Sequence, residues 1–313
     1  MIPSATTTKR EDRASPIHSV PQGQVHMNES EQQVAVVTGA TGGIGRWIAL
    51  GLARAGHHVV MIARDAARGD AAAAWIGQRV PGSSIEVELA DLSSLAATQR
   101  AGQEIAARHP RVALLVNNAG IFTARRQVTA EGHERVLAVN HLAPYVLTHE
   151  LEAALRAGAP SRVINVGSST SDRASIDPDD LELVRGWGMV RAYSQSKLAI
   201  MMSTFALAQR LRGSGVVAHV VHPGAVATDL IRESGLIGIA WRLMAPFMRT
   251  EEQGADAPLD AALAPKWANI TGAYVKDRAA VRPNRRALDP VLVGKVDAAT
   301  RKLALQGLEG GLE

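Results

Sequence analysis

The amino-acid sequence predicts an α/β fold, a doubly wound parallel sheet of the Rossmann type with helices on both faces. Short runs rich in Val, Ile and Leu alternate with segments of helical periodicity from residue 34 to about residue 276. This alternation is typical of βαβ units, whose right-handed crossovers bury a parallel sheet on both faces. A glycine-rich segment follows the first apolar run, and no repeat or linker interrupts residues 34–300. We therefore expect a single domain over residues 33–313.

The predicted strands are short runs that are mostly apolar and end at turn-forming residues. The first, Val34–Val37, precedes the glycine-rich segment, and the fourth ends in Asn117-Asn118-Ala119-Gly120. The sixth is closed by Pro223-Gly224, two residues that favour a turn over a continuing strand. We expect strands at residues 34–37, 58–63, 84–89, 111–116, 162–166 and 216–221, with a seventh near 272–276.

The segments between these strands have the apolar spacing of helices that lay one face on a sheet. The first of them follows the glycine-rich segment and stops at Gly56, a residue type that commonly ends helices. A longer helical region contains Pro144, where we expect a break because proline lacks the backbone N–H. We expect helices at residues 44–55, 66–79, 93–108, 130–157 and 190–212.

Composition and charge exclude several classes of protein. The 313 residues include no Cys, which excludes disulfides, cysteine zinc sites and a catalytic thiol and fits a cytoplasmic location. The net charge is only +4, without long runs of Lys or Arg, so we expect no nucleic-acid partner. No stretch reaches the roughly 18 apolar residues that span a bilayer. Residues 1–32, rich in Ser, Thr, Pro and Gln, are expected to form a disordered tail.

The glycine-rich segment Thr38–Gly45 (TGATGGIG) lies where a βαβ fold binds phosphate groups. Glycine permits a tight turn, lets a pyrophosphate approach the backbone and allows close contact between strand and helix. The helix that follows offers free N–H groups and a partial positive charge at its N-terminus. The expected dinucleotide contacts in this segment are Thr38, Gly39, Thr41, Gly43, Ile44 and Gly45.

The end of the second predicted strand indicates which dinucleotide is bound. An acidic residue there would bind the ribose 2′-hydroxyl of NAD, but Ala63 takes that position and Arg64 follows it. An arginine suits a 2′-phosphate, and Arg46 adds a second positive charge unless its side chain simply faces solvent. We therefore expect NADP(H) as the cofactor in preference to NAD(H).

Further motifs follow along the chain, and together they resemble the short-chain dehydrogenase/reductase family. The glycine-rich segment fits the family pattern TGxxxGxG, and it also fits TGxxGxxG of the extended, epimerase-type branch. The other segments favour the former: Asp91-Leu92, NNAG at 117–120, Asn140, Ser168, Tyr193–Lys197 (YxxxK) and His222-Pro223-Gly224 with Thr228. Within the family, residues 63–65, 139–148, 222–230 and 250–255 are most similar to the retinol-dehydrogenase-like branch.

The resemblance implies a role for each of these residues. Asp91 and Leu92 would contact the adenine ring, while Asn118, Ala119 and Gly120 would lie beside the cofactor. The nicotinamide side would be formed by Pro223, Gly224, Val226 and Thr228. The implied catalytic tetrad is Asn140, Ser168, Tyr193 and Lys197, with Ser169 as the alternative serine. The substrate would be a small carbonyl or alcohol compound, and the protein would form a homodimer or homotetramer.

The spacing of Tyr193 and Lys197 suits proton transfer. Four residues place both side chains on one face of a helix, about one turn apart. A nearby ammonium lowers the pKa of a tyrosine, ordinarily near about 10, and so favours its use as a base. Ser168 would hydrogen-bond the substrate oxygen. Asn140, as the resemblance implies, would hold a water linked to Lys197, and both Tyr193 and Lys197 would also contact the cofactor.

An apolar segment at about 228–250 takes the place of the family's substrate lid. Its apolar character indicates a lipophilic substrate, shallow contact with a membrane or partner, or simple packing onto the domain, and we favour the first. Trp187 is expected to line the same cleft. We expect no metal, because His219 and His222 have no third ligand at a suitable spacing. Two alternatives remain: a non-catalytic dinucleotide-binding sensor or scaffold protein, and a sugar-nucleotide epimerase or dehydratase. The filled tetrad argues against the first, and NNAG argues against the second.

Overall fold

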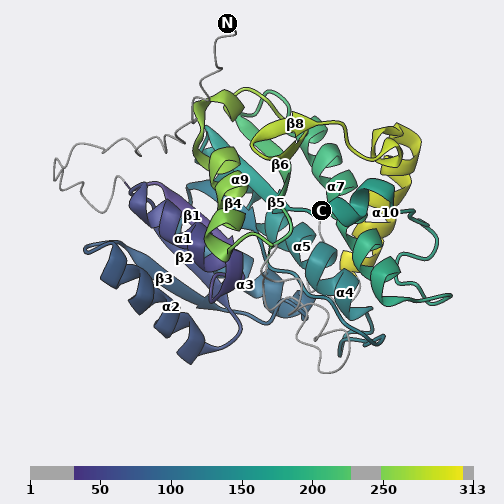
Figure 1. Cartoon of the computed structure of the whole chain (residues 1–313), viewed down its shortest axis with the longest axis horizontal. Helices are drawn as coiled ribbons and strands as arrows, with labels where there is room; N and C mark the ends of the chain where they lie inside the picture. Colours follow the sequence, from purple (N-terminus) through teal and green to yellow (C-terminus); the bar gives the residue numbers. More distant parts are fainter. Residues whose placement is uncertain (1–31, 227–247, 306–313) are drawn as a thin grey trace, which may run out of the picture. The chain divides into compact units, whose positions relative to one another are not determined.

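The fold is built on one sheet of eight strands. The computed structural model describes residues 32–226 and 248–305. The strand order is β3-β2-β1-β4-β5-β6-β7-β8, and every neighbouring pair from β3 to β7 is parallel (Figure 1). The strands are β1 Val34–Thr38, β2 His58–Ala63, β3 Ile85–Leu89, β4 Val112–Asn117, β5 Ser161–Val166, β6 Val216–His222, β7 Ala273–Lys276 and β8 Ala279–Val281. This arrangement confirms the predicted doubly wound sheet and the positions of its first seven strands.

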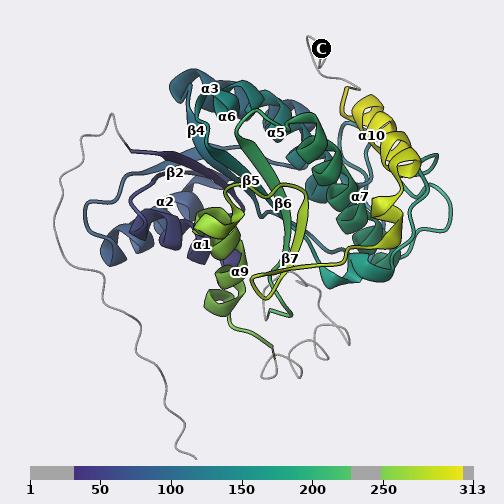
Figure 2. The ribbon, with the colours of Figure 1, turned by 90° about the horizontal axis from the view of Figure 1, so that it is seen from above.

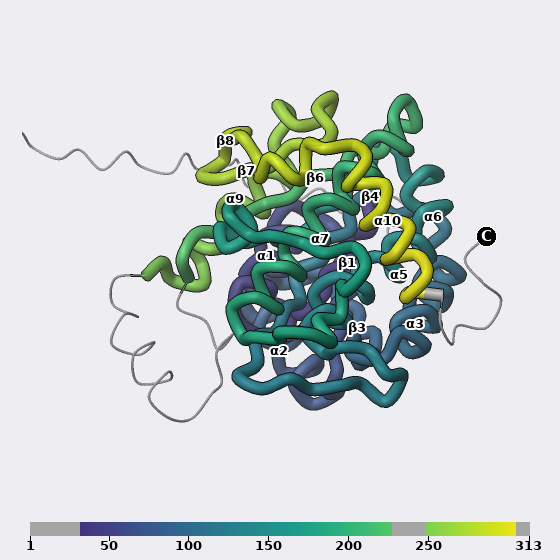
Figure 3. The backbone as a smooth tube through the Cα atoms, turned by 90° about the vertical axis from the view of Figure 1, so that its right-hand side faces the viewer, coloured from purple at the N-terminus to yellow at the C-terminus, as the bar shows by residue number. Residues whose placement is uncertain are grey.

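Helices cover both faces of this sheet. Figure 2 shows α1, α2 and α9 on one side, and α3, α5, α6, α7 and α10 on the other. Their bounds are α1 Gly43–Arg54, α2 Ala66–Arg79, α3 Leu95–Arg108, α4 Arg135–Leu137, α5 Ala143–Glu150, α6 Glu152–Ala157, α7 Met189–Arg210, α9 Glu251–Leu263 and α10 Pro290–Leu305. The last helix, α10, packs on α7 (Figure 3). Val296 of α10 belongs to the same buried cluster as Leu198 and Met202 of α7.

Two hydrophobic cores lie on the two faces of the sheet. One contains Ile48, Leu52 and Ile76 from α1 and α2, together with alanines of α9. The other contains Leu95, Leu147 and Leu207 from α3, α5 and α7. Because the central strands contribute to both cores, their side chains are apolar on both faces, as the unbroken apolar runs of the sequence predict.

The strand order reverses between β1 and β4, so the chain turns in opposite directions on either side of this pair. In open α/β sheets the ligand lies outside the carboxyl ends of the strands at such a reversal. The loops after β1, β2, β3, β4, β5 and β6 all begin at this edge, and the sequence-predicted site residues lie on them or on the helices that follow.

The structure corrects three expectations about secondary structure. The helical region predicted at 130–157 begins only at Arg135, continues through a π-helical turn at Ala138–Leu142, and breaks at Leu151. Pro144 causes no break, since Leu142 and Ala143 before it keep helical φ and ψ and the interruption comes only at Leu151. The helices α9 and α10 were not predicted. The eighth strand is antiparallel and follows β7 through Asp277 and Arg278, both with positive φ.

Two predicted segments fall outside the described residues. They are the tail at 1–32, of which only residue 32 is described, and most of the apolar segment at 228–250. Among the helices of residues 32–226 and 248–305, none is long and apolar enough to cross a membrane.

Candidate active site

The glycine-rich segment forms a tight turn between β1 and α1. Gly39 and Gly43 have φ values of 66° and 56°, in the left-handed region that favours glycine. A Cβ on Gly45 would lie 2.2 Å from the carbonyl oxygen of Gly39 and 2.4 Å from Nδ2 of Asn118, so no side chain fits there. Helix α1 starts without a side-chain cap and has no acidic residue in its first turn. Its N–H groups therefore remain free for an anion.

The ends of β1 and β4 are tied together beside this turn. The hydroxyl of Thr38 accepts hydrogen bonds from the backbone N–H groups of Asn118 (3.0 Å) and Ala119 (2.9 Å). The side-chain amide of Asn118 donates to the carbonyl oxygens of Thr38 (3.0 Å) and Gly39 (3.3 Å). These bonds fix the gap between the two strands at the point where the strand order reverses.

Three arginines surround the outer side of the turn, and they differ in their partners. Arg64 is exposed at the end of β2 and has no partner among the described residues. Arg46 stacks on Trp75, 4.3 Å from the ring centroid, and lies 3.9 Å from Glu251. Arg68, which the sequence analysis did not single out, has a guanidinium nitrogen 3.7 Å from the position of a Cβ on Gly42. Its placement in the first turn of α2, three residues after the N-cap Asp65, was the available signal.

Asp91 and Leu92 follow β3 at the same edge. The carboxylate of Asp91 accepts hydrogen bonds from the N–H and the hydroxyl of Ser93, at 2.9 and 2.8 Å. Leu92 is buried. The turn after β3 is therefore stabilised both by the hydrogen bonds of Asp91 and by the packing of Leu92.

Tyr193 and Ser168 meet at the carboxyl end of β5. Ser168 is buried directly after that strand, and its Oγ accepts a hydrogen bond from the hydroxyl of Thr170 at 3.1 Å. Tyr193 lies in the first turns of α7 and is 8% exposed, so its hydroxyl is shielded from bulk water. Burial raises the pKa of Tyr193, while its hydrogen bond to Ser168 acts in the opposite direction.

Lys197 lies one turn further along α7 and is buried. Its Nζ donates to the carbonyl oxygen of Val166 at 2.8 Å and lies 5.9 Å from the ring centroid of Tyr193. No carboxylate pairs with it among the described residues, and desolvation lowers its pKa to about 8. A buried ammonium without a counter-ion is costly, and such groups concentrate at functional sites.

Asn140 lies in the π-helical turn that interrupts the predicted helix. Its Oδ1 accepts from the N–H of Ile121 at 2.7 Å, and its Nδ2 donates to Oγ of Ser196 at 3.1 Å. A Cβ on Gly120 would lie 3.4 Å from both Oδ1 of Asn140 and Nζ of Lys197, so the two polar groups flank the same point. Such π turns occur mostly at functional sites.

An apolar wall surrounds the Tyr193 ring. Phe122 packs edge-on against it at a centroid distance of 5.1 Å, and Ile121 and Trp187 join the same cluster. The indole N–H of Trp187 donates to Oε1 of Glu134 at 3.2 Å, which fixes the ring's direction. Ile121 and Phe122 were missed from sequence, although they directly follow NNAG.

The loop after β6 brings its backbone toward the glycine-rich turn. Gly224 has a φ of 92°. Val226 and Ile44 both approach one glycine of α9, Gly254, where a Cβ would be 2.7 Å from Val226 and 3.0 Å from Ile44. Pro223 receives a hydrogen bond at 3.4 Å from the guanidinium of Arg249. Thr228, the last predicted residue of this loop, lies outside the described residues.

A separate group of titratable side chains lies at the opposite, amino end of the strands. Nε2 of His58 and of His109 approach one oxygen of Glu86, at 3.3 and 2.8 Å, and Arg108 pairs with the other oxygen at 2.8 Å. These partners lower the pKa of Glu86 against the effect of burial. These side chains bond to one another and so form a network that joins β2, β3 and the end of α3.

Comparison with known proteins identifies the family. Residues 33–236 match the family model described as short chain dehydrogenase. The chain belongs to the short-chain dehydrogenase family. Retinol dehydrogenase 12 of Bos taurus is 38% identical over 245 residues, which cover 78% of each chain.

Solved structures agree with this assignment. A crystal structure of an uncharacterised protein from Mycobacterium Paratuberculosis has a TM-score of 0.71 and 30% identity, covering 87% of this chain and 93% of that one. A blue fluorescent protein from a metagenomic library, in complex with NADPH, has a TM-score of 0.62 and 30% identity, covering 78% and 95%. This short-chain dehydrogenase is thus an oxidoreductase of the retinol-dehydrogenase-like branch that acts on CH–OH or C=O groups.

Proposed function

We propose that this short-chain dehydrogenase interconverts a lipophilic carbonyl compound and its alcohol, prefers NADP(H), and uses Tyr193 as the acid and base. The observation that carries the proposal is the convergence of Ser168, Tyr193 and the unpaired Lys197 at the carboxyl edge of the sheet, beside the glycine-rich turn. All three are buried, and neither Ser168 nor Lys197 belongs to the apolar cluster around Tyr193.

The residues of the turn fit a dinucleotide. Gly39 and Gly45 keep the backbone free of side chains, and the uncapped N-terminus of α1 suits a pyrophosphate. Asp91, Leu92 and the 118–120 segment would hold the adenine and ribose side, and the 223–228 loop the nicotinamide side. When bound, the dinucleotide supplies or accepts the hydride at the substrate carbon.

Tyr193 moves the proton in this proposal. In carbonyl reduction its Oη gives a proton to the substrate oxygen, and burial supports that role because the raised pKa keeps the hydroxyl protonated. Ser168 hydrogen-bonds Tyr193, a contact that lowers the pKa of the tyrosine and so favours its ionised form, and Ser168 also positions the substrate oxygen.

Lys197 favours the reverse direction. Its ammonium is held near the Tyr193 ring by Val166 and stabilises a tyrosinate. Asn140 lies at the same point beside Gly120, where a water linked to Lys197 would connect the tyrosine to solvent.

The preference for NADP(H) rests on unpartnered positive charge beside the turn. Arg64 has no partner within residues 32–226 and 248–305, and Arg68 approaches Gly42, so both are available for a 2′-phosphate. Arg46 contributes less in this proposal, because Trp75 and Glu251 already hold its guanidinium. The similar metagenomic protein whose structure contains NADPH supports the same preference.

The proposed lipophilic substrate rests on the wall of Ile121, Phe122 and Trp187 around Tyr193. Apolar and aromatic lining with a few polar groups is typical of small-molecule sites. The similarity to proteins named retinol dehydrogenase 12 supports an apolar alcohol or aldehyde as substrate. A cytoplasmic location is a separate part of the proposal.

The experiment is a comparison of NADPH and NADH consumption with a panel of aldehydes, ketones and quinones of increasing apolar length. We expect turnover with NADPH and lower KM for longer substrates. Arg64→Ala and Arg68→Ala should each weaken NADPH binding by about tenfold or more, with little effect on NADH, because each removes a charged hydrogen bond of roughly 1.5–3 kcal/mol.

The exposed Arg54→Ala variant is the matched control, since Arg54 has no partner among the described residues. Equal losses for both cofactors would contradict the 2′-phosphate role. Tight NADPH binding without turnover on any carbonyl would instead favour a sensor.

A further inference from the structure

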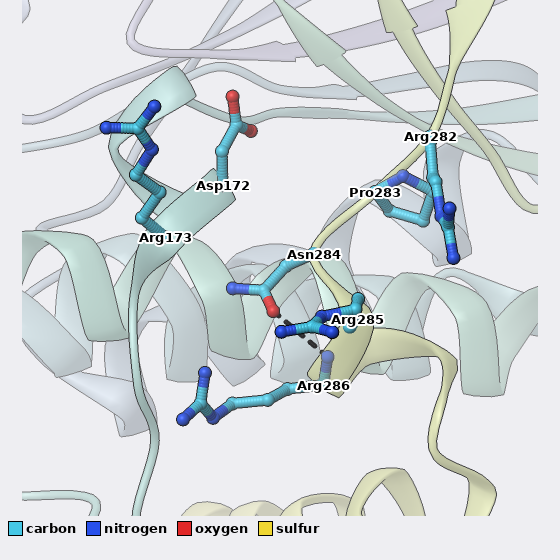
Figure 4. Close-up of a pocket in the computed structure, with 7 residues that line it drawn as sticks. All are labelled: Asp172, Arg173, Arg282, Pro283, Asn284, Arg285 and Arg286. Atoms are coloured by element: carbon cyan, nitrogen blue, oxygen red, sulfur yellow. Dashed lines mark hydrogen bonds between the residues drawn. The ribbon is translucent and has the colours of Figure 1, made fainter.

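A second basic site lies on the other half of the molecule, behind the turn that carries Ser168. A cavity of about 580 Å³ is lined by Arg173, from the 3-10 turn Ser169–Arg173, and by Arg282, Arg285 and Arg286, which follow β8 (Figure 4). We call this cavity the arginine hollow. It shares no residue with the predicted dinucleotide site.

The four arginines are exposed, and their guanidinium groups have no counter-ion in the part of the chain that the structure describes. None of them forms an ion pair or side-chain hydrogen bond with any of residues 32–226 and 248–305. The one carboxylate that lines the arginine hollow, on Asp172, is already bound by Lys276 and by the hydroxyl of Tyr274 (2.8 Å). The hollow therefore concentrates positive charge that the described chain does not neutralise.

The segment that carries three of these arginines is held rigidly. Asn284 is buried, and its Nδ2 donates to the carbonyl oxygens of Ser171 (2.8 Å) and Ala174 (2.9 Å). Its Oδ1 accepts from the N–H of Arg286 at 2.9 Å, which starts the 3-10 turn Arg285–Leu288. Ala287 then packs into the cluster between α7 and α10. The arginine-bearing turn is thus fixed to the turn after β5.

We propose that the arginine hollow binds an anion through a phosphate group. Guanidinium groups donate paired N–H bonds that match the oxygens of a phosphate, and a dianion offsets more of the mutual repulsion than a single carboxylate does. The fixed backbone reduces the ordering that binding requires. A soluble phosphate compound and a phospholipid headgroup offer this same chemistry.

The test uses the full-length, tag-free protein at low ionic strength, where screening is weakest. Calorimetric titration of the NADPH-saturated protein with inorganic pyrophosphate should give saturable binding to the wild type, because NADPH then occupies the glycine-rich turn. The double variant Arg285→Ala/Arg286→Ala should weaken pyrophosphate binding by about tenfold or more. The variant Arg285→Lys/Arg286→Lys keeps the charge but not the paired N–H groups, so it should weaken binding by about threefold. NADPH binding should be unchanged in both variants.

The matched control is Arg54→Ala/Arg100→Ala. It removes two exposed arginines on the opposite half of the sheet, neither of which has a partner among the described residues. Its pyrophosphate affinity should equal that of the wild type. A second arm measures sedimentation with phosphatidylcholine vesicles that do or do not contain phosphatidic acid. Arginine-dependent binding to pyrophosphate alone identifies a soluble ligand, and such binding to the acidic vesicles identifies a lipid headgroup. Loss of equal size in the control, or no arginine-dependent binding in either arm, would overturn the proposal.

Discussion

The two halves of the sheet build their parts of the candidate site by different means. Around β1 and β4 the site is mostly backbone: two glycines with positive φ, an excluded Cβ at Gly45, and the hydrogen bonds between Thr38 and Asn118. Around β5 and β6 it consists of buried titratable side chains. Burial lowers the pKa of Lys197 to about 8 and that of both His219 and His222 to about 4.

The two halves therefore differ in whether the same residues serve both stability and function. The first half binds through shape and backbone dipoles, so its stability and its function depend on the same residues. The second half keeps unpaired polar groups in a poorly solvated setting, so there a gain in stability is expected to accompany a loss of function.

The largest expected effect is on turnover, from Lys197→Met. Removal of the buried ammonium should lower kcat by about 10²–10⁴-fold, because it withdraws the charge that tunes Tyr193. Stability should not fall, since the lowered folded-state pKa means that the charged lysine opposes folding at neutral pH. That opposition is complete below about pH 8 and disappears as the pH rises toward about 10.5, so the wild type should gain on the variant over this range.

Urea unfolding of both proteins from neutral to alkaline pH provides the measurement. The exposed Lys302→Met serves as the control and should change neither quantity. A variant that loses stability at neutral pH would show that the ammonium holds the fold together.

In the first half, Gly45→Ala should damage binding and stability together. The added Cβ would lie 2.2 Å from the carbonyl oxygen of Gly39, so β1 and α1 must separate. We expect a loss of about 3 kcal/mol in the free energy of unfolding and a loss of NADPH affinity of about 100-fold.

Thermal unfolding and fluorescence titration with NADPH measure these two losses. Gly77→Ala is the matched control, because a Cβ there meets nothing within 4 Å. It should leave affinity intact and raise stability by up to about 1 kcal/mol. Normal NADPH affinity in the Gly45 variant would contradict the backbone cradle.

The sequence was sufficient to predict most of the first half, because its signals are local. The apolar runs, the glycine pattern and Arg64 depend on neighbours a few residues away. Arg68 was missed because only the packing of α2 directs its side chain toward Gly42. The β7–β8 hairpin was missed for another reason: its two turn residues are Asp277 and Arg278, not the Asn-Gly or Asp-Gly that normally marks positive φ at both positions.

The second half depends on contacts distant in sequence. The spacing of Tyr193 and Lys197 was readable, and the structure brings Ser168 and Asn140 to them. The π-helical turn at Asn140 and the wall formed by Phe122 arise from tertiary packing, so the sequence indicated only a helix with a break at Pro144 and no π turn. The start of helix α9 can be predicted from sequence, because Thr250 and Gln253 have the spacing of a capping box.

Acid should also lower stability without touching the proposed chemistry. The folded-state pKa is about 3 for His141 and about 4 for His219 and His222, against about 6.5 in the unfolded chain. The contribution of these neutral histidines to the free energy of unfolding is fully present above about pH 6.5. It is lost as the pH falls toward about 4, by up to about 1.4 kcal/mol per pH unit for each histidine.

Urea unfolding at about pH 7.5 and 5.5 should therefore differ by a few kcal/mol. His219→Phe should reduce this difference by about one-third, whereas replacement of the half-buried His149 by Gln should not change it. Equal stability of the wild type at both pH values would contradict the burial of neutral histidines.

The most direct test of the central claim measures NADPH binding and turnover in the same preparation of Tyr193→Phe, beside the control Tyr145→Phe. Only the hydroxyl is removed, and the ring keeps its contact with Phe122. We predict that turnover falls by about 10²–10⁴-fold in the Tyr193 variant while NADPH affinity stays within about threefold of the wild type, and that the Tyr145 variant keeps both. Retained turnover in Tyr193→Phe would contradict the assignment of this hydroxyl as the proton donor and acceptor.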